Sequence, residues 1–299
     1  MRHPNCRRYN AFRETREPKQ TIFVLLHRGR PGTIRRVKDF LKKTFGNGEK
    51  ESGRRFEGKV AVVTGASAGI GLATAMAFAS EGATVVMLSR REVEGNRALE
   101  KVKKESPGSV FMTTDVTDGP QVQSAFARIK DQFGEIDAAV NNAGTFHGGT
   151  HLTGMEEADF DRVLATNIKG TWFCIREEVP LMEKRGGAIV NMSSMSGLVA
   201  TPNLGAYVAS KHAIIGMTRV AALDYVEKHI RVNAVCPGFV RTEMTAEVGE
   251  SWLRRRVPIQ RWIEAEEIAE TVLFLCSGAA HSIIGQAIVV DGGATLRSG

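Results

Sequence analysis

The sequence predicts an α/β fold in which a doubly wound, seven-stranded parallel sheet carries helices on both faces. From Phe56 onward, short apolar runs alternate with amphipathic stretches of helical period. Parallel strands need a crossover between them, usually a helix, and strands covered on both sides consist almost entirely of apolar residues. A glycine-rich turn directly after the first apolar run is the second observation that favours this fold.

Seven apolar runs are the predicted strands, and each has the length of a short buried strand. They are Lys59–Gly65, Ala83–Ser89, Ser109–Asp115, Ile136–Asn141, Ala188–Met192, Ile230–Val235 and Gln286–Val290. Six helical patterns lie between them and cover Ile70–Ser80, Glu92–Glu105, Asp118–Phe133, Met155–Lys184, Tyr207–Lys228 and Glu264–Cys276. Gly82 and Gly134 follow the first and third of these helices, and Pro120 lies near the start of the third, as is usual at helix ends.

Charge divides the 299 residues into two parts. Residues 1–55 contain 16 Lys/Arg and 5 Asp/Glu, whereas residues 56–299 contain 24 and 28, so the formal net charge of +7 comes from the first part. Its composition predicts a flexible basic extension with one short helix over residues 33–45, followed by one large domain. The extension fits a targeting presequence, a contact with an anionic surface, or a dispensable segment. Nucleic-acid binding would depend on the extension alone, and the acidic domain argues against it.

Four cysteines, Cys6, Cys174, Cys236 and Cys276, lie far apart and lack the spacing of a metal site. They predict neither a disulfide scaffold nor a bound metal, and they favour a reducing compartment. We therefore expect a cytoplasmic protein, or one of an organellar matrix if the extension is a targeting peptide. The longest apolar run of the extension, residues 22–26, is far shorter than the roughly 20 residues that a membrane span needs, so no span is expected.

The turn after the first strand is predicted to bind the phosphates of a dinucleotide. It reads TGASAGIG and opens a helix. Gly65 permits the tight turn, Gly69 lets the backbone approach a pyrophosphate, and Gly71 allows the helix to pack closely on the strand. The free N–H groups at the start of the helix then hydrogen-bond the phosphates. Ser67 and Ile70 belong to the same turn and are expected at the cofactor.

The end of the second strand indicates which dinucleotide binds. NAD is usually held by an acidic residue about 20 positions further on, which hydrogen-bonds the ribose 2′-hydroxyl. Here the strand ends in Ser89-Arg90-Arg91, without a carboxylate. A guanidinium suits a 2′-phosphate, so NADP(H) is favoured, with Arg90 as the better candidate and Arg91 as the second. NAD(H) stays open, because Ala68 stands where a basic residue is sometimes found and both arginines also fit a solvated helix start.

A serine, a tyrosine and a lysine mark the predicted reaction centre. Tyr207 and Lys211 are four residues apart, so a helix places both side chains on one face. A tyrosine has a pKa of ~10 in water, and an adjacent ammonium lowers that pKa because it stabilises the phenolate. Ser194 lies upstream of a glycine-containing turn and can hydrogen-bond the same substrate oxygen. Taken alone, the spacing also fits an ordinary surface helix.

With Asn141-Asn142-Ala143-Gly144 after the fourth strand and Pro237-Gly238 after the sixth, the chain resembles the short-chain dehydrogenase/reductase family. The single-domain branch of that family shares the TGxxxGxG, NNAG and YxxxK motifs found here, over about residues 56–293. The resemblance implies a Rossmann-type dinucleotide-binding catalytic domain over residues 56–299, with a small substrate lid near residues 242–263. It also implies hydride transfer between NADP(H) and a carbonyl or secondary alcohol, a small-molecule substrate, and a homotetramer or homodimer.

The resemblance implies four catalytic residues. Tyr207 is expected to act as general acid/base, and Ser194 to orient and polarise the substrate oxygen. Lys211 is expected to lower the pKa of Tyr207 and hold the nicotinamide ribose, and Asn167 to anchor a water that relays protons to solvent. Ser193 is interpreted as a turn residue, because only Ser194 has the family spacing. The competing hypothesis is a catalytically idle dinucleotide-binding sensor or scaffold, against which the complete set of four residues argues.

The resemblance also implies which residues line each part of the cofactor. The implied set is Asp115 and Val116 at the adenine, Asn142, Ala143 and Gly144 at the middle, and Tyr207, Lys211, Pro237, Gly238, Val240 and Thr242 at the nicotinamide end.

Within the predicted lid, Trp252, Leu253, Val257 and Trp262 are expected to form an apolar cover. The arginines of the segment either attract an anionic substrate or face water, and the second interpretation is favoured; they are Arg254, Arg255, Arg256 and Arg261. Trp262 replaces a glycine common in the family, so a different entry to the last helix is expected.

His147 and His151 follow the NNAG motif, four residues apart. They lack a convincing third ligand, so no metal site is predicted, and they are interpreted as bordering the substrate entrance. Substrate identity stays open at this stage.

Overall fold

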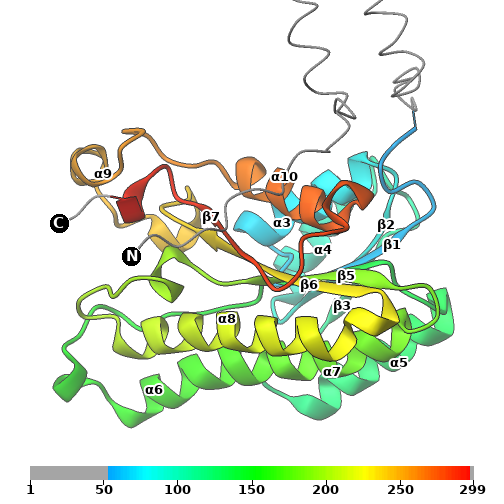
Figure 1. The fold of residues 1–299 in the computed structure, drawn as a ribbon, viewed down its shortest axis with the longest axis horizontal. Helices are drawn as coiled ribbons and strands as arrows, with labels where there is room; N and C mark the ends of the chain where they lie inside the picture. Colours follow the sequence, from blue (N-terminus) through cyan, green and yellow to red (C-terminus); the bar gives the residue numbers. More distant parts are fainter. Residues whose placement is uncertain (1–52, 297–299) are drawn as a thin grey trace, which may run out of the picture. The chain divides into compact units, whose positions relative to one another are not determined.

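A computed structural model describes residues 53–296 (Figure 1). Within them, seven strands form one parallel sheet in the order β3-β2-β1-β4-β5-β6-β7. The prediction of a doubly wound α/β fold is therefore confirmed. The predicted extension, including its short helix over residues 33–45, lies outside the described residues except for residues 53–55.

Each strand falls within two residues of its predicted run. The bounds are β1 Val60–Thr64, β2 Thr84–Ser89, β3 Val110–Thr113, β4 Ala138–Asn141, β5 Gly187–Met192, β6 Ile230–Pro237 and β7 Ala287–Val290. Strands β1 and β4 are neighbours, and the chain runs outward from them in opposite directions, to β2 and β3 on one side and to β5, β6 and β7 on the other. Such a reversal opens a crevice at the carboxyl ends of the two central strands, where ligands bind in this class of fold.

Helices cover both faces of the sheet (Figure 1). Their bounds are α3 Gly69–Ser80, α4 Glu92–Val102, α5 Gly119–Phe133, α6 Glu157–Leu164, α7 Gly170–Met182, α8 Gly205–Tyr225, α9 Glu250–Arg256 and α10 Ala265–Cys276. Helices α3, α4 and α10 pack on one face, and α5, α7 and α8 on the other. Along β1, Ala61 and Val63 contact the first set, and Val62 contacts the second. Burial on both faces explains why the strands are apolar throughout.

The long helical region predicted over Met155–Lys184 is confirmed over residues 157–182, but it is not one regular α-helix. Helices α6 and α7 are joined there by a π-helical turn, Ala165–Lys169, that contains Asn167. The Asn167 side chain accepts a hydrogen bond from the Thr145 backbone N–H at 2.8 Å and donates one to the Thr145 carbonyl at 2.9 Å. These bonds join the turn to a residue 22 positions away, and no sequence pattern indicated the turn. Turns of this kind are frequent at functional sites.

The predicted lid contains α9, which the sequence pattern did not indicate. The helix is only seven residues long, and its buried Leu253 belongs to a small cluster with Val257 and Trp262, against which Phe239 and Ala294 also pack. A segment this short shows less than two turns of amphipathic period, so a helix cannot be told from a loop by pattern alone.

Candidate active site

The glycine-rich turn has the geometry that its three glycines predict. Gly65 and Gly69 adopt φ values of +65° and +53°, in the left-handed region that favours glycine. A β-carbon on Gly71 would lie 2.3 Å from the carbonyl oxygen of Gly65 and 2.5 Å from Nδ2 of Asn142. Helix α3 can therefore pack this closely on β1 only if residue 71 has no side chain.

The start of α3 fits a phosphate group. Its N-cap, Ala68, makes no side-chain hydrogen bond to the first turn, and the first turn holds no acidic residue. The backbone N–H groups there lack a capping side chain, and the partial positive charge of the helix N-terminus is not offset locally. Gly69 and Ile70 line a pocket at this point, so the turn provides the donors that an anionic ligand requires.

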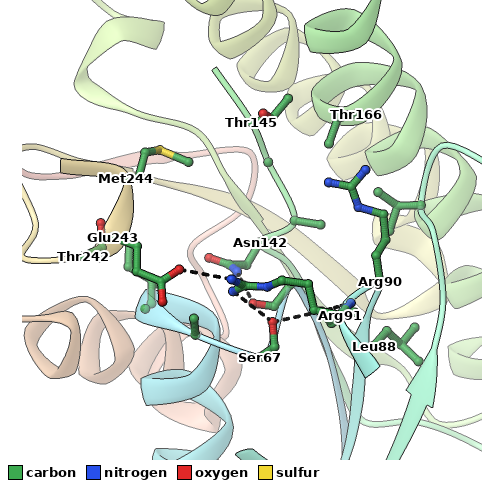
Figure 2. A pocket seen from close by; sticks show the side chains of 18 of the residues that line it. Ser67, Leu88, Arg90, Arg91, Asn142, Thr145, Thr166, Thr242, Glu243 and Met244 are labelled. Atoms are coloured by element: carbon green, nitrogen blue, oxygen red, sulfur yellow. Dashed lines mark hydrogen bonds and ion pairs between the residues drawn. The ribbon is translucent and has the colours of Figure 1, made fainter. Parts of the chain in front are cut away.

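That pocket has a volume of about 530 Å³, within the usual range for cofactor and small-molecule sites (Figure 2). It lies at the carboxyl ends of the central strands, as the strand order predicts. Ten of the predicted cofactor residues line it, namely Gly65, Ser67, Gly69, Ile70, Arg90, Val116, Asn142, Ala143, Gly144 and Thr242.

Seven predicted cofactor residues are not part of the pocket wall: Gly71, Asp115, Tyr207, Lys211, Pro237, Gly238 and Val240. Three of them make contacts elsewhere in the fold. Asp115 hydrogen-bonds Thr117, and Gly238 packs so closely on Asp291 that a β-carbon would lie 2.7 Å from its Cα. Buried Val240 pairs with Ile263 at the base of the lid.

Nine other wall residues were not predicted from the sequence: Ala68, Leu88, Ser89, Thr114, Thr145, Phe146, Thr166, Glu243 and Met244. Arg91, the second candidate for the 2′-phosphate, also lines the pocket. Ser89 and Thr114 lie where β2 and β3 end, so the predicted strand ends could have identified them as pocket residues. Glu243 comes from the lid, far along the chain, and nothing local in the sequence indicated it.

The two arginines that follow β2 have different partners (Figure 2). Arg91 donates from Nη2 to Ser67 Oγ at 3.3 Å and from Nη1 to the Glu243 carboxylate at 3.1 Å. Arg90 instead forms an ion pair with Asp115, with a nitrogen–oxygen distance of 3.7 Å. Of the two, Arg91 is thus the one in contact with the phosphate turn.

The predicted reaction centre is assembled beside the pocket. Tyr207 and Lys211 lie one turn apart on α8, with the Lys211 Nζ atom 5.5 Å from the centroid of the tyrosine ring. Tyr207 is hydrogen-bonded to Ser194, which follows β5. Two pocket residues lie next to the reaction centre. The Phe146 and Tyr207 rings pack edge to face, with 6.5 Å between their centroids. A β-carbon on Gly144 would lie 3.5 Å from Lys211 Nζ.

Burial dominates the electrostatics of this centre. It raises the pKa of the Tyr207 phenol, and the hydrogen bond with Ser194 opposes the rise. Burial also lowers the pKa of Lys211 to about 8. The pKa of Tyr207 is thus shifted upward, opposite to the expected direction, and burial is the main cause. The Lys211 ammonium donates a 2.8 Å hydrogen bond to the Met192 carbonyl.

Asn167 and Ser193 form hydrogen bonds that connect the predicted reaction centre to neighbouring elements of the fold. Besides its bonds to Thr145, the Asn167 amide donates to Ser210 Oγ at 2.9 Å, and its backbone carbonyl accepts from the Thr171 hydroxyl at 2.8 Å. The Ser193 hydroxyl donates to the Lys211 carbonyl at 2.8 Å, which ties the end of β5 to α8. This contact agrees with the interpretation of Ser193 as a structural residue.

The lid differs from its predicted form. Leu253, Val257 and Trp262 are buried against one another, whereas Trp252 is 39% exposed and packs edge to face on Phe239. The three buried side chains thus form a small core within the lid instead of an apolar cover.

Trp262 lies just before α10, and the Arg241 guanidinium packs over its ring, with 5.6 Å between the guanidinium carbon and the ring centroid. Two of the lid arginines pair with nearby carboxylates: Arg261 with Glu267 at 2.6 Å and Arg254 with Glu250 at 3.9 Å.

His147 is buried, and its Nδ1 atom hydrogen-bonds the neighbouring Gly148 carbonyl. Across residues 53–296, no group of three or more His, Cys, Asp and Glu side chains could hold a metal ion. No helix in that part of the chain is long and apolar enough to cross a membrane.

Behind the NNAG motif lies a buried carboxyl group. Asn141 Nδ2 donates to Glu178 Oε2 at 3.1 Å and to Asn191 Oδ1 at 3.0 Å. The second oxygen of Glu178 and the Asn141 side-chain carbonyl oxygen have no hydrogen-bond partner among the described residues. Burial raises the pKa of Glu178 to about 8, so the side chain is largely protonated at neutral pH.

We expect Glu178→Gln to stabilise the fold increasingly as the pH rises from about 4.5 to about 8. The unfolded chain releases the Glu178 proton near its ordinary pKa of 4.5, whereas the folded chain keeps it until about 8. The unfolded state therefore binds fewer protons in this range, and the free energy of unfolding falls with pH. Glutamine abolishes that loss, which at pH 8 is on the order of 2–4 kcal/mol.

Urea unfolding of both proteins at several pH values measures the difference. Glu177→Gln, which removes a charge from the less buried side of the same helix, controls for a general charge effect. A stability difference between Glu178→Gln and the native chain that does not change from pH 5 to pH 8 would contradict the account.

A parallel α/β sheet with a glycine-rich phosphate turn and a serine, tyrosine and lysine at its carboxyl edge defines a dinucleotide-binding oxidoreductase. A family model described as enoyl-(acyl carrier protein) reductase matches residues 65–295. The chain belongs to the short-chain dehydrogenase/reductase family, whose members act on alcohols and carbonyls.

Individual relatives span most of the chain. It is 37% identical over 265 residues to a 3β-hydroxysteroid dehydrogenase of Mediterraneibacter gnavus, covering 81% of this chain and 96% of the relative. It is 39% identical over 249 residues to the 3-oxoacyl-(acyl-carrier-protein) reductase of Thermotoga maritima, covering 81% and 100%. Among solved structures, a short-chain dehydrogenase/reductase of Mycobacterium marinum matches with a TM-score of 0.78 and 30% identity over 81% of this chain and 97% of that one.

Proposed function

We propose that the chain is an NADP(H)-dependent oxidoreductase that transfers hydride between the cofactor and a carbonyl or secondary alcohol. The observation that carries the proposal is the contact between the pocket and the reaction centre. Gly144 and Phe146 belong to the pocket wall and also adjoin Lys211 and Tyr207. A dinucleotide in the pocket can therefore present its reactive end where Tyr207 exchanges a proton.

The residues present fit the cofactor. The uncapped start of α3 would bind the pyrophosphate, and Asn142, Ala143 and Gly144 would line the middle of the cofactor. Arg91 and Ser67 supply donors for a 2′-phosphate, with Arg90 nearby. Bound NADPH supplies the hydride.

Tyr207 then moves the proton. Because burial raises its pKa, the phenol is protonated at neutral pH and suits the donation of a proton to a developing alkoxide. Ser194, hydrogen-bonded to Tyr207, orients the same substrate oxygen. Lys211, whose pKa is about 8, carries its positive charge at neutral pH and favours the phenolate left behind. Asn167 is proposed to anchor the water that returns a proton, and oxidation of an alcohol follows the same path in reverse.

The substrate is proposed to be a small carbonyl compound with an apolar part. Leu198 and Val199, in the loop before α8, and Phe146, at the pocket, are each 37–39% exposed. The relatives include a 3β-hydroxysteroid dehydrogenase and a 3-oxoacyl-(acyl-carrier-protein) reductase. The homotetramer or homodimer expected from the family is supported by exposed apolar side chains on α7 and α8, where Trp172 is 48% and Leu223 is 75% exposed.

A substrate screen tests the proposal. Steroid ketones, quinones, sugars and 3-oxoacyl thioesters are offered with NADPH or NADH, and the loss of nicotinamide absorbance is recorded for the full-length protein. The proposal expects consumption of NADPH with at least one carbonyl class. Failure of NADPH to bind in an equilibrium titration would refute it.

The arginines after β2 are expected to set the preference between NADP(H) and NAD(H). Arg91→Gln should weaken NADPH binding about tenfold or more, because it removes the donor beside Ser67, and should leave NADH binding nearly unchanged. Arg90→Asp should shift the preference in the same direction by placing a carboxylate at the end of β2. Titrations of both cofactors check this, with Arg97→Gln on the outer part of α4 as the control. Equal losses for NADPH and NADH would contradict it.

A further inference from the structure

The end of the pocket near β2 is electrically balanced. Arg90 and Arg91 bring two positive charges, and Asp115 and Glu243 bring two carboxylates within 3.7 Å and 3.1 Å of them. A site dedicated to a 2′-phosphate would instead carry an excess of positive charge. Of the two carboxylates, Glu243 pairs with the arginine that also contacts the phosphate turn (Figure 2).

The backbone at Glu243 is held by local hydrogen bonds. It begins a single 3₁₀ turn, Glu243–Thr245, in which the Thr242 and Thr245 side chains cap each other's backbone. The Thr245 hydroxyl also donates to the Val240 carbonyl at 2.5 Å, which fixes the turn to the segment after β6. The carboxylate therefore comes from an ordered turn at the base of the lid.

Arg91 links Glu243 to the proposed phosphate site. One guanidinium nitrogen donates to Glu243 and another to Ser67, so the carboxylate occupies a donor that a 2′-phosphate would use. A phosphate monoester carries a charge of about −1.5 to −2 at neutral pH, so a phosphate bound to Arg91 would also be repelled by the Glu243 carboxylate. A ribose 2′-hydroxyl is uncharged, and neither effect applies to it.

We propose that Glu243 is a cofactor-specificity residue, an inference that rests on the proposed NADP(H)-dependent function. Its carboxylate competes with the 2′-phosphate for Arg91 and so reduces the preference for NADP(H) over NAD(H). The preference is set by a lid residue as well as by the residues that follow β2.

The test is equilibrium binding to the full-length protein, measured by calorimetry with NADP⁺, NAD⁺ and adenosine 2′-monophosphate. Glu243→Gln is expected to tighten NADP⁺ and adenosine 2′-monophosphate binding about threefold to tenfold and to change NAD⁺ binding less than twofold. The gain should shrink in high salt, because both side chains are largely exposed. Glu247→Gln, in the same lid, controls for the loss of one negative charge.

A double-mutant cycle with Arg91→Gln shows whether the effect passes through that residue. The proposal expects Glu243→Gln to give no tightening when Arg91 is already glutamine. An unchanged ratio of NADP⁺ to NAD⁺ affinity in Glu243→Gln, or the same tightening with and without Arg91, would overturn it. If the native chain binds neither NADP⁺ nor adenosine 2′-monophosphate, the proposed function fails as well; if it binds NADP⁺ and only the Glu243 effect is missing, the proposed function stands.

Discussion

Tyr207→Phe is expected to lower the rate of carbonyl reduction by about 100- to 10,000-fold while NADPH still binds. The substitution removes only the hydroxyl that is hydrogen-bonded to Ser194 and that donates the proton. The ring remains, with its contacts to Phe146 and Lys211. Because Tyr207 is outside the pocket wall, the affinity for NADPH should change little. Steady-state rates and a binding titration on the same preparation measure both quantities.

Tyr225→Phe is the matched control, since it removes a phenol hydroxyl from the far end of the same helix. That variant should keep its activity and its melting temperature. Turnover by Tyr207→Phe at the native rate would show that the proton comes from another group. Loss of NADPH binding together with turnover would show that Tyr207 holds the pocket together.

Gly71→Ala is expected to damage the pocket by a purely steric route. The new β-carbon would lie 2.3 Å from the Gly65 carbonyl oxygen and 2.5 Å from Asn142 Nδ2, closer than real β-carbons come to other atoms. Helix α3 must move away from β1, which widens the phosphate turn. Overpacking of this kind costs about 1–3 kcal/mol of stability, and we expect NADPH affinity to fall at least tenfold.

Gly216→Ala provides the comparison, because Gly216 lies within α8 and a β-carbon added there would meet no atom within 4 Å. Replacing this helical glycine should stabilise the protein by up to about 1 kcal/mol. Thermal unfolding and NADPH titration of the two variants separate the steric effect from the loss of a glycine. A Gly71→Ala protein with native affinity would contradict the proposed role of the turn.

The sheet could be predicted from the sequence almost to the residue, because burial on both faces leaves apolar runs that end at polar or glycine residues. The π-helical turn between α6 and α7 could not be predicted. Asn167, in this turn, hydrogen-bonds Thr145, which is 22 positions away. A contact between such distant residues does not affect the local periodicity of the sequence. Helix α9 was not predicted because it is too short to show the period of an amphipathic helix.

Site residues that directly follow a strand could be predicted from the sequence. Site residues that come from segments far along the chain could not. Arg90 and Arg91 were both identified at the end of β2, but their order depends on which one reaches Ser67 and Glu243 in three dimensions. The pKa of Tyr207 was predicted in the wrong direction. Spacing along a helix shows that Lys211 is near, whereas the cost of burying a phenolate depends on the packing around it.

The most direct test of hydride transfer at this site uses NADPH deuterated at C4, prepared as each of the two epimers. After reduction of a carbonyl identified by the screen, mass spectrometry of the product counts the deuterium atoms. We predict one deuterium on the carbinol carbon from one epimer and none from the other, since a fixed pocket presents one face of the ring. A product without deuterium from either epimer, or with equal amounts from both, would contradict hydride transfer within this pocket.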